Sequence, residues 1–416
     1  MLRATRNAVV GAVAGFSMLA GVTSAANAAT LFVGPSASSP GTSCKHTGYT
    51  SIQLAIDAAT PGSTITVCGG TYKEQLTIET EVNLLGKGKP VLALPASPQS
   101  TNTPCDRAIN AVTGGADEDL VSICGPKVSI SKITFEAKWP EGTCDDSLYN
   151  IMVAGGGTLA ASKVTLNGAG AFPINGCQGG VGLEVGFGYG IDEAGHATLN
   201  KVRIENYQKN GVTVDGRGSS ASIASTTITG AGPADQGQNG IQVSRGAVAD
   251  ISKVRISDNE CTAPTCGSSS RQNWAEDAAG VLFYEPGASS TVSSSKLSEN
   301  NLGVEYVSGE PPAKSEIALT ADKISGGYAS ALLDQGDATL EGDKLSGALY
   351  GIDLNSNFGE DDSYAPQVTA TGDKIEGSTA AVQVESSLAG LTGSLTVLGG
   401  HINGAIVNND PQFTIQ

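Results

Sequence analysis

The chain has 416 residues, with 41 acidic and 24 basic side chains and a formal net charge of −17. That charge argues against nucleic acid and anionic membrane surfaces as partners and favours solubility. Glycine accounts for 55 residues and aromatic residues for 5%, which indicates a β-rich repeat protein rather than an α/β enzyme with a large aromatic pocket.

The first residues predict a secretory signal peptide, residues 1–28. Arg3 and Arg6 supply a positive start, residues 8–20 form an apolar run, and Ala26-Asn27-Ala28 is a small-x-small cleavage signal. The apolar run is too short for a spanning helix, and no later stretch is long and apolar enough to span. We therefore expect a secreted, extracellular protein without a membrane span.

The chain has eight cysteines, an even number that predicts disulfides in an exported protein. A zinc site is the alternative, but there are only three histidines and no Cys-x-x-Cys pair. Pairing nearest neighbours along the chain gives four predicted disulfides: Cys44–Cys68, Cys105–Cys124, Cys144–Cys177 and Cys261–Cys266.

Residues 29–90 are expected to form an N-terminal cap and the first coil of a repeat fold, and residues 91–416 continue the same domain. A solenoid needs a cap because its open end exposes apolar core and unpaired backbone. A short amphipathic helix is predicted between an N-cap at Thr50 or Ser51 and Pro61-Gly62, followed by a strand over residues 63–68. The apolar stripe of this helix is Ile52, Ala55, Ile56 and Ala59.

Two short phrases alternate through the rest of the chain. The first is a lysine followed by an aliphatic residue, and Thr227 and His401 hold the same place in two further copies. This phrase begins at Lys132, Lys163, Lys201, Lys253, Lys296, Lys323, Lys344 and Lys374. The second phrase, small–aliphatic–x–aliphatic, begins at Gly182, Gly211, Gly240, Gly280, Gly303, Ser330, Gly351 and Ala381.

The spacing of these phrases predicts a parallel β-solenoid. From Lys296 to Gly303 the offset is 7 residues, and it is 7 again in the three pairs that follow. Two short strands joined by one turn of fixed length and one of variable length describe a coil of such a solenoid. About ten or eleven coils are expected.

Several stretches resemble a known family. "SIQLAIDAA", "PGSTITVCGGTYKEQLTI" and "VNLLGKG" look like the entry segment of right-handed parallel β-helix proteins of the pectin-lyase-like superfamily. "CDDSLYNIMVAGGGTLAASKVTL" and "INGCQGGVGLEVG" are similar to secreted actinobacterial members. The resemblance implies an all-β fold, a single-stranded right-handed parallel β-helix with an N-terminal capping helix. This fold hosts polysaccharide lyases, hydrolases, esterases, epimerases and non-catalytic surface proteins, so it does not fix the activity.

The catalytic motifs of these enzymes do not match the chain. It has no Asp-Phe-Ile-Phe-Gly of pectinesterases, no Arg-x-Pro-x-x-Arg of calcium-dependent pectate lyases and no Asp-Pro-His-Asp of alginate epimerases. The nearest strings to the polygalacturonase set, "GEDD" at 359–362 and "GHA" at 195–197, are far apart and in reverse order. His46, His196 and His401 are isolated, so nucleophilic hydrolysis has no support.

Outward residues of the second phrase predict two columns on one sheet, which in family enzymes often floors the substrate groove. The first column is Glu184, Thr213, Gln242, Leu282, Glu305, Leu332, Asp353 and Gln383, and the second is Gly186, Asp215, Ser244, Tyr284, Val307, Asp334, Asn355 and Glu385. Coils lie ~4.8 Å apart, which suits the roughly 5–9 Å carboxylate separations of acid/base sugar chemistry. The candidate catalytic residues are therefore Glu305, Asp334 and Asp353, and solvated side chains on an exposed sheet are the alternative.

Residues beside these acids are the candidates for ligand binding. Substrate contacts are assigned to Glu184, Asp215, Tyr284 and Asn355. The candidate platforms for sugar stacking are Trp139, Tyr149, Tyr189, Trp274 and Tyr284. No cofactor is expected; calcium among these carboxylates, or at Glu360-Asp361-Asp362 beside Asp353, is the alternative.

The lysines of the first phrase predict a row of cations on successive coils. Such a row is either a basic stripe for an anionic polysaccharide or a solvated face. In "GDKLSG", Lys344 is expected to face outward and Leu345 inward. Asp322, Asp343 and Asp373 each stand directly before a lysine and are expected to offset its charge.

Two functional interpretations remain open, and whether the protein is an enzyme is undecided. The first is a secreted β-helix without a recognisable catalytic site that engages extracellular or cell-surface polysaccharide or serves a structural role. The second is a carbohydrate-active enzyme, a polysaccharide lyase or glycoside hydrolase, with a divergent carboxylate site on the exposed sheet. The missing family motifs favour the first.

Overall fold

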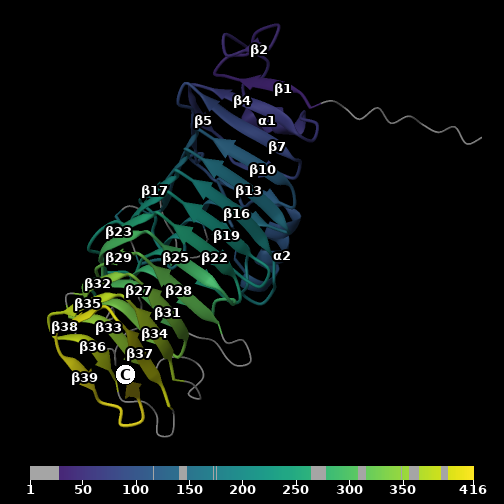
Figure 1. The fold of residues 1–416 in the computed structure, drawn as a ribbon. Helices are drawn as coiled ribbons and strands as arrows, with labels where there is room; N and C mark the ends of the chain where they lie inside the picture. The colour runs from purple at the N-terminus through teal and green to yellow at the C-terminus, as the bar shows by residue number, and fades with distance from the viewer. Residues whose placement is uncertain are drawn as a thin grey trace, which may run out of the picture.

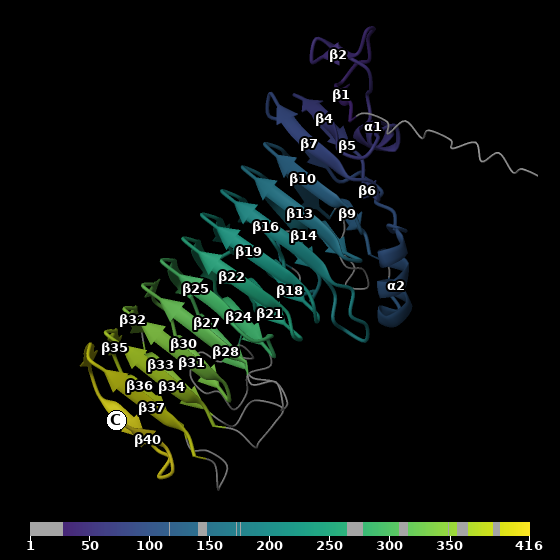
Figure 2. The same ribbon diagram turned by 45° about the vertical axis from the view of Figure 1, so that its right-hand side comes forward.

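A computed structural model describes residues 28–115, 117–139, 148–171, 173–174, 176–263, 278–307, 315–347, 349–355, 365–385 and 392–416. These residues form three long sheets in which neighbouring strands come from successive coils. Figures 1 and 2 show the coils stacked from the N-terminal to the C-terminal end of an elongated body. The predicted signal peptide lies outside the described residues, apart from Ala28.

Most coils contribute one strand to each sheet, and all pairings within the three sheets are parallel. Sheet I contains β1 (Thr30–Val33), β4 (Ser63–Cys68), β7 (Val82–Lys87), β10 (Lys127–Ser131), β13 (Gly157–Ser162), β16 (Gly195–Asn200), β19 (Ser220–Ala224), β22 (Val248–Ser252), β25 (Ser290–Ser293), β28 (Glu316–Thr320), β31 (Asp337–Glu341), β34 (Gln367–Thr371), β37 (Ser394–Leu398) and β40 (Thr414–Ile415). Sheet II contains β5 (Thr71–Lys73), β8 (Val91–Ala93), β11 (Thr134–Lys138), β14 (Thr165–Gly170), β17 (Arg203–Glu205), β20 (Thr227–Thr229), β23 (Arg255–Asn259), β26 (Lys296–Asn300), β29 (Lys323–Ile324), β32 (Lys344–Gly347), β35 (Lys374–Gly377) and β38 (His401–Asn403). Sheet III contains β6 (Leu76–Ile78), β9 (Val121–Cys124), β12 (Tyr149–Ala154), β15 (Val181–Val185), β18 (Asn210–Asp215), β21 (Asn239–Ser244), β24 (Ala279–Tyr284), β27 (Leu302–Val307), β30 (Ala329–Asp334), β33 (Tyr350–Asn355), β36 (Ala380–Val384) and β39 (Ile406–Asn408).

The core lies inside the coil and is built from alternate residues of every strand. The second phrase is in register as predicted, because its first aliphatic residues pair from strand to strand: Leu183, Val212, Ile241, Val281, Val304, Ala331, Ile352 and Val382. All of these side chains are buried. Sheets II and III each contain 12 strands among the described residues, so the stack is slightly longer than the predicted ten or eleven coils.

The structure shows that the predicted lysine row combines two different positions at the corner between sheets I and II. Lys163, Lys201 and Lys253 adopt left-handed backbone, with φ of 54°, 58° and 53°, and form the corner itself, as does Lys132. Lys296 instead lies two positions further along its coil, in the first position of β26. The sequence prediction did not distinguish the corner lysines from the strand lysines, because both precede a buried aliphatic residue. Examples are Val164 after Lys163 and Leu297 after Lys296.

The N-terminal helix forms where the sequence predicts it. Helix α1 (Ile52–Asp57) begins after the N-cap Ser51, whose side chain accepts the Leu54 N–H, and buries Ile52, Ala55 and Ile56. It packs against β1, β4 and β6. Because β1 pairs with β4 ahead of it in sheet I, the role of α1 as the cap of the solenoid stays a prediction.

Two features of the described residues were not predicted. Strands β2 (Thr42–Ser43) and β3 (His46–Thr47) form a small antiparallel hairpin. Helix α2 (Pro104–Thr113) begins with a capping box between Thr103 and Asp106 and ends at Gly114, whose φ of 72° favours glycine. This helix lies beside sheet III, next to β9, in Figure 2.

Two of the predicted disulfides are confirmed, Cys44–Cys68 and Cys105–Cys124. Cys177 and Cys261 are also disulfide-bonded, but the partners predicted for them, Cys144 and Cys266, lie outside the described residues. Disulfides fit an extracellular or periplasmic protein. Within the described ranges, no helix is long and apolar enough to cross a membrane.

Candidate functional site

Sheet III carries the acidic candidates, and their register is as predicted. The first column is confirmed from Glu184 through Thr213, Gln242, Leu282, Glu305, Leu332 and Asp353 to Gln383. The second column is confirmed for Asp215, Ser244, Tyr284, Val307, Asp334 and Asn355. Gly186 and Glu385 lie just beyond the ends of their strands.

The expectation that this face of sheet III is exposed is wrong. Glu305 is 1% exposed, and Asp334 and Asp353 are fully buried. The other polar candidates are buried as well, Glu184, Asp215 and Asn355. A catalytic role for these acids stays a prediction, and it would have to operate from a site shielded from water.

Apolar residues within the same columns explain this burial. Met152, one strand before Glu184 in the register, packs with Ile109 of α2. Leu282 and Leu332 pack with Tyr328 in the connection before β30. Helix α2 and Tyr328 therefore lie over this face of sheet III, and they shield the neighbouring acids from water.

The three candidate catalytic acids lie within two coils of one another. Glu305 and Asp353 share the first column with Leu332 between them, and Asp334 lies in the second column of the middle strand. The Tyr328 side chain hydrogen-bonds Asp353, and burial, followed by the charge of Asp353, raises the pKa of Tyr328. A phenol thus meets one carboxyl group, with two further carboxyl groups within two coils, and these are group types that transfer protons in sugar chemistry.

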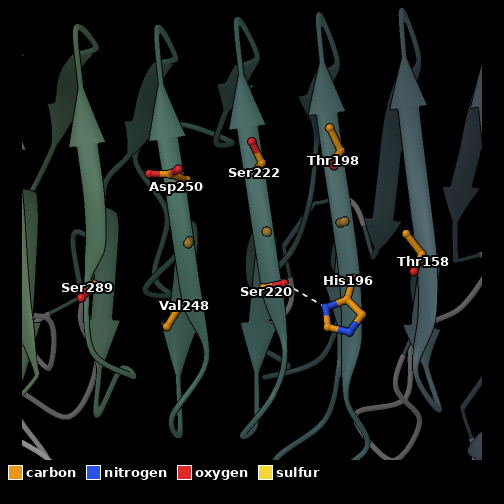
Figure 3. Close-up of a pocket in the computed structure, with 11 residues that line it drawn as sticks. Thr158, His196, Thr198, Ser220, Ser222, Val248, Asp250 and Ser289 are labelled. Carbon is orange, nitrogen blue, oxygen red and sulfur yellow. Dashed lines mark hydrogen bonds between the residues drawn. The ribbon is translucent and has the colours of Figure 1, made fainter.

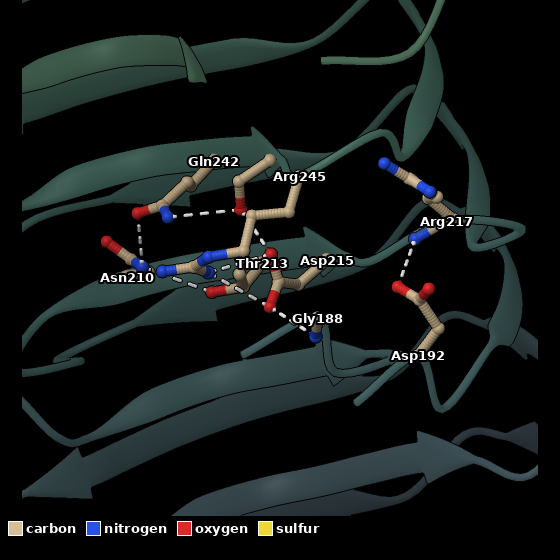
Figure 4. A network of polar contacts seen from close by, with 9 residues as sticks. Gly188, Asp192, Asn210, Thr213, Asp215, Arg217, Gln242 and Arg245 are labelled. Carbon is tan, nitrogen blue, oxygen red and sulfur yellow. Dashed lines mark hydrogen bonds and ion pairs between the residues drawn. The ribbon is translucent and has the colours of Figure 1, made fainter. Parts of the chain in front are cut away.

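Asp215 belongs to a polar network at the C-terminal end of β18, shown in Figure 4. Its carboxylate accepts the Gly188 N–H at 2.7 Å and the Ser244 hydroxyl at 2.7 Å. Arg245 Nη1 donates to both carboxylate oxygens, at 2.9 and 3.1 Å. Because protein donors surround it, Asp215 positions Arg245 in this structure.

Arg245 joins this buried network to the surface. Its guanidinium lies over the Tyr189 ring, 5.8 Å from the centroid, and Tyr189 is 60% exposed. Of the aromatic candidates that the structure describes, Tyr189 is the most exposed: Trp139 and Tyr149 are buried and Tyr284 is half-buried. Trp274 lies outside the described residues.

A further group of buried acids lies near α2 and was not predicted. Asp119 is fully buried and accepts the Thr101 hydroxyl at 3.2 Å. Burial, then the charges of Asp106 and Asp117, raise the pKa of Asp119 well above its usual range. Burial also raises the pKa of Glu184, with Asp215 adding to the effect. Desolvation favours the neutral form of both acids.

The outer face of sheet I has a shallow groove of about 660 Å³, shown in Figure 3. His196 Nδ1 and the Ser220 hydroxyl lie 2.9 Å apart on neighbouring strands. Asp250 is two coils from His196 and accepts the Thr291 hydroxyl instead. The pair therefore lacks the carboxylate that would orient a catalytic histidine. Sequence reasoning missed the pair because the two residues are 24 positions apart.

Sheet II carries a continuous basic row on its outer face. The strand register places Arg255, Lys296, Lys323, Lys344, Lys374 and His401 on six successive strands. Every one of these side chains is exposed. We call these six residues the basic row. Lys344 faces outward and Leu345 inward, as predicted.

Few acids oppose the basic row on its own face. The next outward position holds Ser257, Ser298 and Ser346 on three of its strands, and Glu376 on a fourth. Glu376 pairs with Lys374 at 2.9 Å. Asp322, Asp343 and Asp373, expected to offset the lysines, are buried and accept backbone N–H groups, so the offset of the lysine charges stays a prediction. The outward position beside the row is therefore uncharged on three of these strands, whereas Asp258 and Glu299 lie further along two of them.

The sequence prediction gave two positions for calcium, one among the acids of sheet III and one at residues 360–362. Among the residues that the structure describes, no group of three or more His, Cys, Asp or Glu side chains could hold a metal ion. The predicted calcium alternative at Glu360-Asp361-Asp362 lies outside these ranges.

Comparison with known proteins identifies the handedness of the coil. Residues 188–357 match a family model described as "Right handed beta helix region", and together with the sheet topology this match shows a right-handed parallel β-helix, as predicted. The likeness to actinobacterial members stays a prediction. No curated protein matches the chain.

Several solved structures are similar over most of the chain. The Azotobacter vinelandii mannuronan C-5 epimerase AlgE6 A-module has 15% identity, covers 88% of this chain and 93% of its own, and has a TM-score of 0.49. Pectate lyase Pel9A has 10% identity, with 93% and 79% covered and a TM-score of 0.41. A pectin methylesterase in complex with a hexasaccharide has 12% identity, with 87% and 94% covered and a TM-score of 0.39.

Proposed function

We propose that this right-handed β-helix is a secreted protein that binds a linear acidic polysaccharide along the basic row of sheet II. The observation that carries the proposal is the register of Arg255, Lys296, Lys323, Lys344 and Lys374 on five successive strands, all exposed. A straight row of cations along the axis of a rigid coil matches a polymer that carries an anionic group on each repeat.

The charges in the row repel one another until a polyanion is bound. Two lysines at the ~4.8 Å strand spacing repel by about 0.9 kcal/mol in water, and salt weakens this further. The free protein tolerates such a cost. A polyanion removes the repulsion and releases the counterions around its own charges, so binding gains from the row as a whole.

The surface beside the row suits a carbohydrate. Ser298 and Ser346 offer hydroxyl groups that both donate and accept hydrogen bonds, whereas the Ser257 hydroxyl already donates to Asp258 at 2.6 Å. The small side chains of all three serines leave the lysines accessible. Sugar hydroxyls have the same donor and acceptor capacity. The row therefore combines charge attraction with neutral hydrogen-bonding groups.

A binding panel tests this proposal. The purified protein is run by affinity electrophoresis against polygalacturonate and alginate, with methyl-esterified pectin and dextran as uncharged controls. We expect retardation by the two acidic polymers and none by the controls. The variant K323Q/K344Q should lose most of this retardation, while K163Q/K201Q, with the same charge change at corner residues, should keep it. Equal behaviour of the two variants would reject the basic row as the binding surface.

A carbohydrate-active enzyme is the second candidate, favoured by the contact between Tyr328 and Asp353 beside Glu305 and Asp334. Its test follows unsaturated products and reducing ends on the same polymers, with and without calcium. Product formation that disappears in D353N and persists in K323Q/K344Q would support catalysis at sheet III, separate from binding at sheet II.

A further inference from the structure

The cations of the basic row do not all have the same surroundings. Four of them form no ion pair with any residue that the structure describes: Arg255, Lys296, Lys323 and Lys344. The next, Lys374, has its Nζ 2.9 Å from Glu376 Oε1. Glu376 holds the outward position that is Ser257, Ser298 and Ser346 on other strands of the row. A carboxylate therefore replaces a small neutral side chain at the C-terminal end of the row.

Glu376 is held beside the row by more than Lys374. Asn403 Nδ2, on the next strand, donates to Glu376 Oε1 at 3.0 Å. The bonds from Asn403 and Lys374, and then the charges of Lys374 and Lys344, lower the pKa of Glu376. Glu376 is thus an ionised carboxylate that interacts with two lysines of the row. It lies where the anionic group of a bound polymer would contact Lys374.

The N-terminal end of the row is limited in a different way. On β20, Thr227 takes the place of the cation, between Arg203 and Arg255. Arg203 Nη2 pairs with Glu205 Oε2 at 2.5 Å. The unpaired cations therefore lie on four successive strands, β23, β26, β29 and β32, which span about 14 Å at the ~4.8 Å strand spacing.

We propose that Glu376 is an end stop of the polysaccharide site, so that the basic row binds a short segment with about four anionic groups, one for each unpaired cation. This inference rests on the proposed function of the row. Because Glu376 belongs to the same strand as Lys374, it competes with a ligand carboxylate at high local concentration. It also repels a polyanion that continues past Lys344. The site therefore suits a short acidic stretch within a longer polysaccharide.

Two variants move the end stop in opposite directions. E376S gives the position the residue of other coils and frees Lys374, so binding to polygalacturonate at 50 mM salt should tighten about fivefold. S346E places the same carboxylate one coil earlier, next to Lys344, and should weaken binding by a similar factor. The slope of log affinity against log salt should become steeper by about 0.7 in E376S and shallower by about 0.7 in S346E, one lysine in each case.

Lysine footprinting locates the end of the bound polymer. The full chain is acetylated with and without polygalacturonate, and the protection of each lysine is read by mass spectrometry. In the wild type we expect protection of Lys296, Lys323 and Lys344 but not of Lys374. In E376S, Lys374 should become protected as well.

The control E205S breaks the Arg203–Glu205 pair with the same change of charge. It should keep the wild-type affinity within twofold, because Thr227 separates Arg203 from the row. Full protection of Lys374 in the wild type, or equal tightening in E376S and E205S, would overturn the end stop while leaving binding along the row intact. Protection of no lysine of the row would instead overturn both the end stop and the proposed function.

Discussion

Asp343 and Asp373 lie on successive coils, and the main-chain N–H of Asp343 donates to Asp373 Oδ1 at 2.6 Å. Each of these aspartates directly precedes a lysine of the basic row, Lys344 and Lys374. A buried aspartate therefore directly precedes an exposed lysine at the start of each strand, and the two side chains lie on opposite sides of the sheet. Ionisation of the aspartate adds a negative charge near the place where the lysine would bind an anionic ligand.

Binding to the basic row should weaken as pH rises. Asp322 and Asp343, with pKa values raised to about 6 and about 7 by burial, become negative beside the lysines between pH 5 and pH 8. At an assumed separation of roughly 7 Å, an ionised aspartate repels a charge of the polyanion by ~0.6 kcal/mol in water, or about threefold in affinity. Titration of alginate at pH 5 and pH 8 should show this loss in the wild type and much less of it in D322N/D343N. Both proteins should carry H401Q, which removes the histidine at the end of the basic row; an equal loss in both would refute the coupling.

The contacts of Asp215 with Arg245 and its other donors predict that the Asp215 carboxylate stabilises the folded protein. D215A leaves the Gly188 N–H, the Ser244 hydroxyl and part of the Arg245 guanidinium without their acceptor, which should cost about 3 kcal/mol. The control D192A removes an exposed carboxylate that accepts the Arg217 N–H at 3.2 Å, and should cost under about 0.5 kcal/mol. Urea unfolding of the two variants gives both values. Similar midpoints would mean that Asp215 does not anchor this corner.

The Cys105–Cys124 disulfide should hold α2 over sheet III. Removing a bridge that closes 19 residues costs about 3 kcal/mol on loop entropy. In C105A/C124A we expect faster amide exchange in residues 104–113 and greater accessibility around Met152. C44A/C68A removes a bridge of similar span, 24 residues, at the N-terminal hairpin and should leave α2 protected. Unchanged exchange in C105A/C124A would show that packing alone keeps α2 in place.

The solenoid could be predicted from the sequence because its core repeats in every coil. Leu183, Val212 and Ile241 each follow a glycine, and their register was fixed by that pattern. The lysine phrase was ambiguous because an inward residue follows both the corner lysine Lys163 and the strand lysine Lys296. Only the left-handed φ of Lys163 separates the two positions, and sequence does not reveal it.

The covering of sheet III could not be predicted because it depends on contacts between distant segments. Helix α2 buries only Cys105, Asp106 and Ile109, too few apolar residues for a recognisable stripe. Tyr328 lies in a short connection, and its packing on Leu332 follows from the shape of two coils together. The acids of sheet III were therefore placed correctly along the strands and wrongly assigned to the solvent.

The basic row is tested most directly by the salt dependence of binding to an acidic polysaccharide. Affinity is measured from 50 to 200 mM salt for wild type, for K296Q/K323Q/K344Q, and for the corner variant K132Q/K163Q/K201Q. We predict that the row variant binds at least tenfold more weakly at 50 mM salt and that its slope of log affinity against log salt falls by about 2, since three lysines no longer displace counterions. The corner variant should keep a slope close to wild type. Equal slopes for the two triple variants would contradict binding along sheet II.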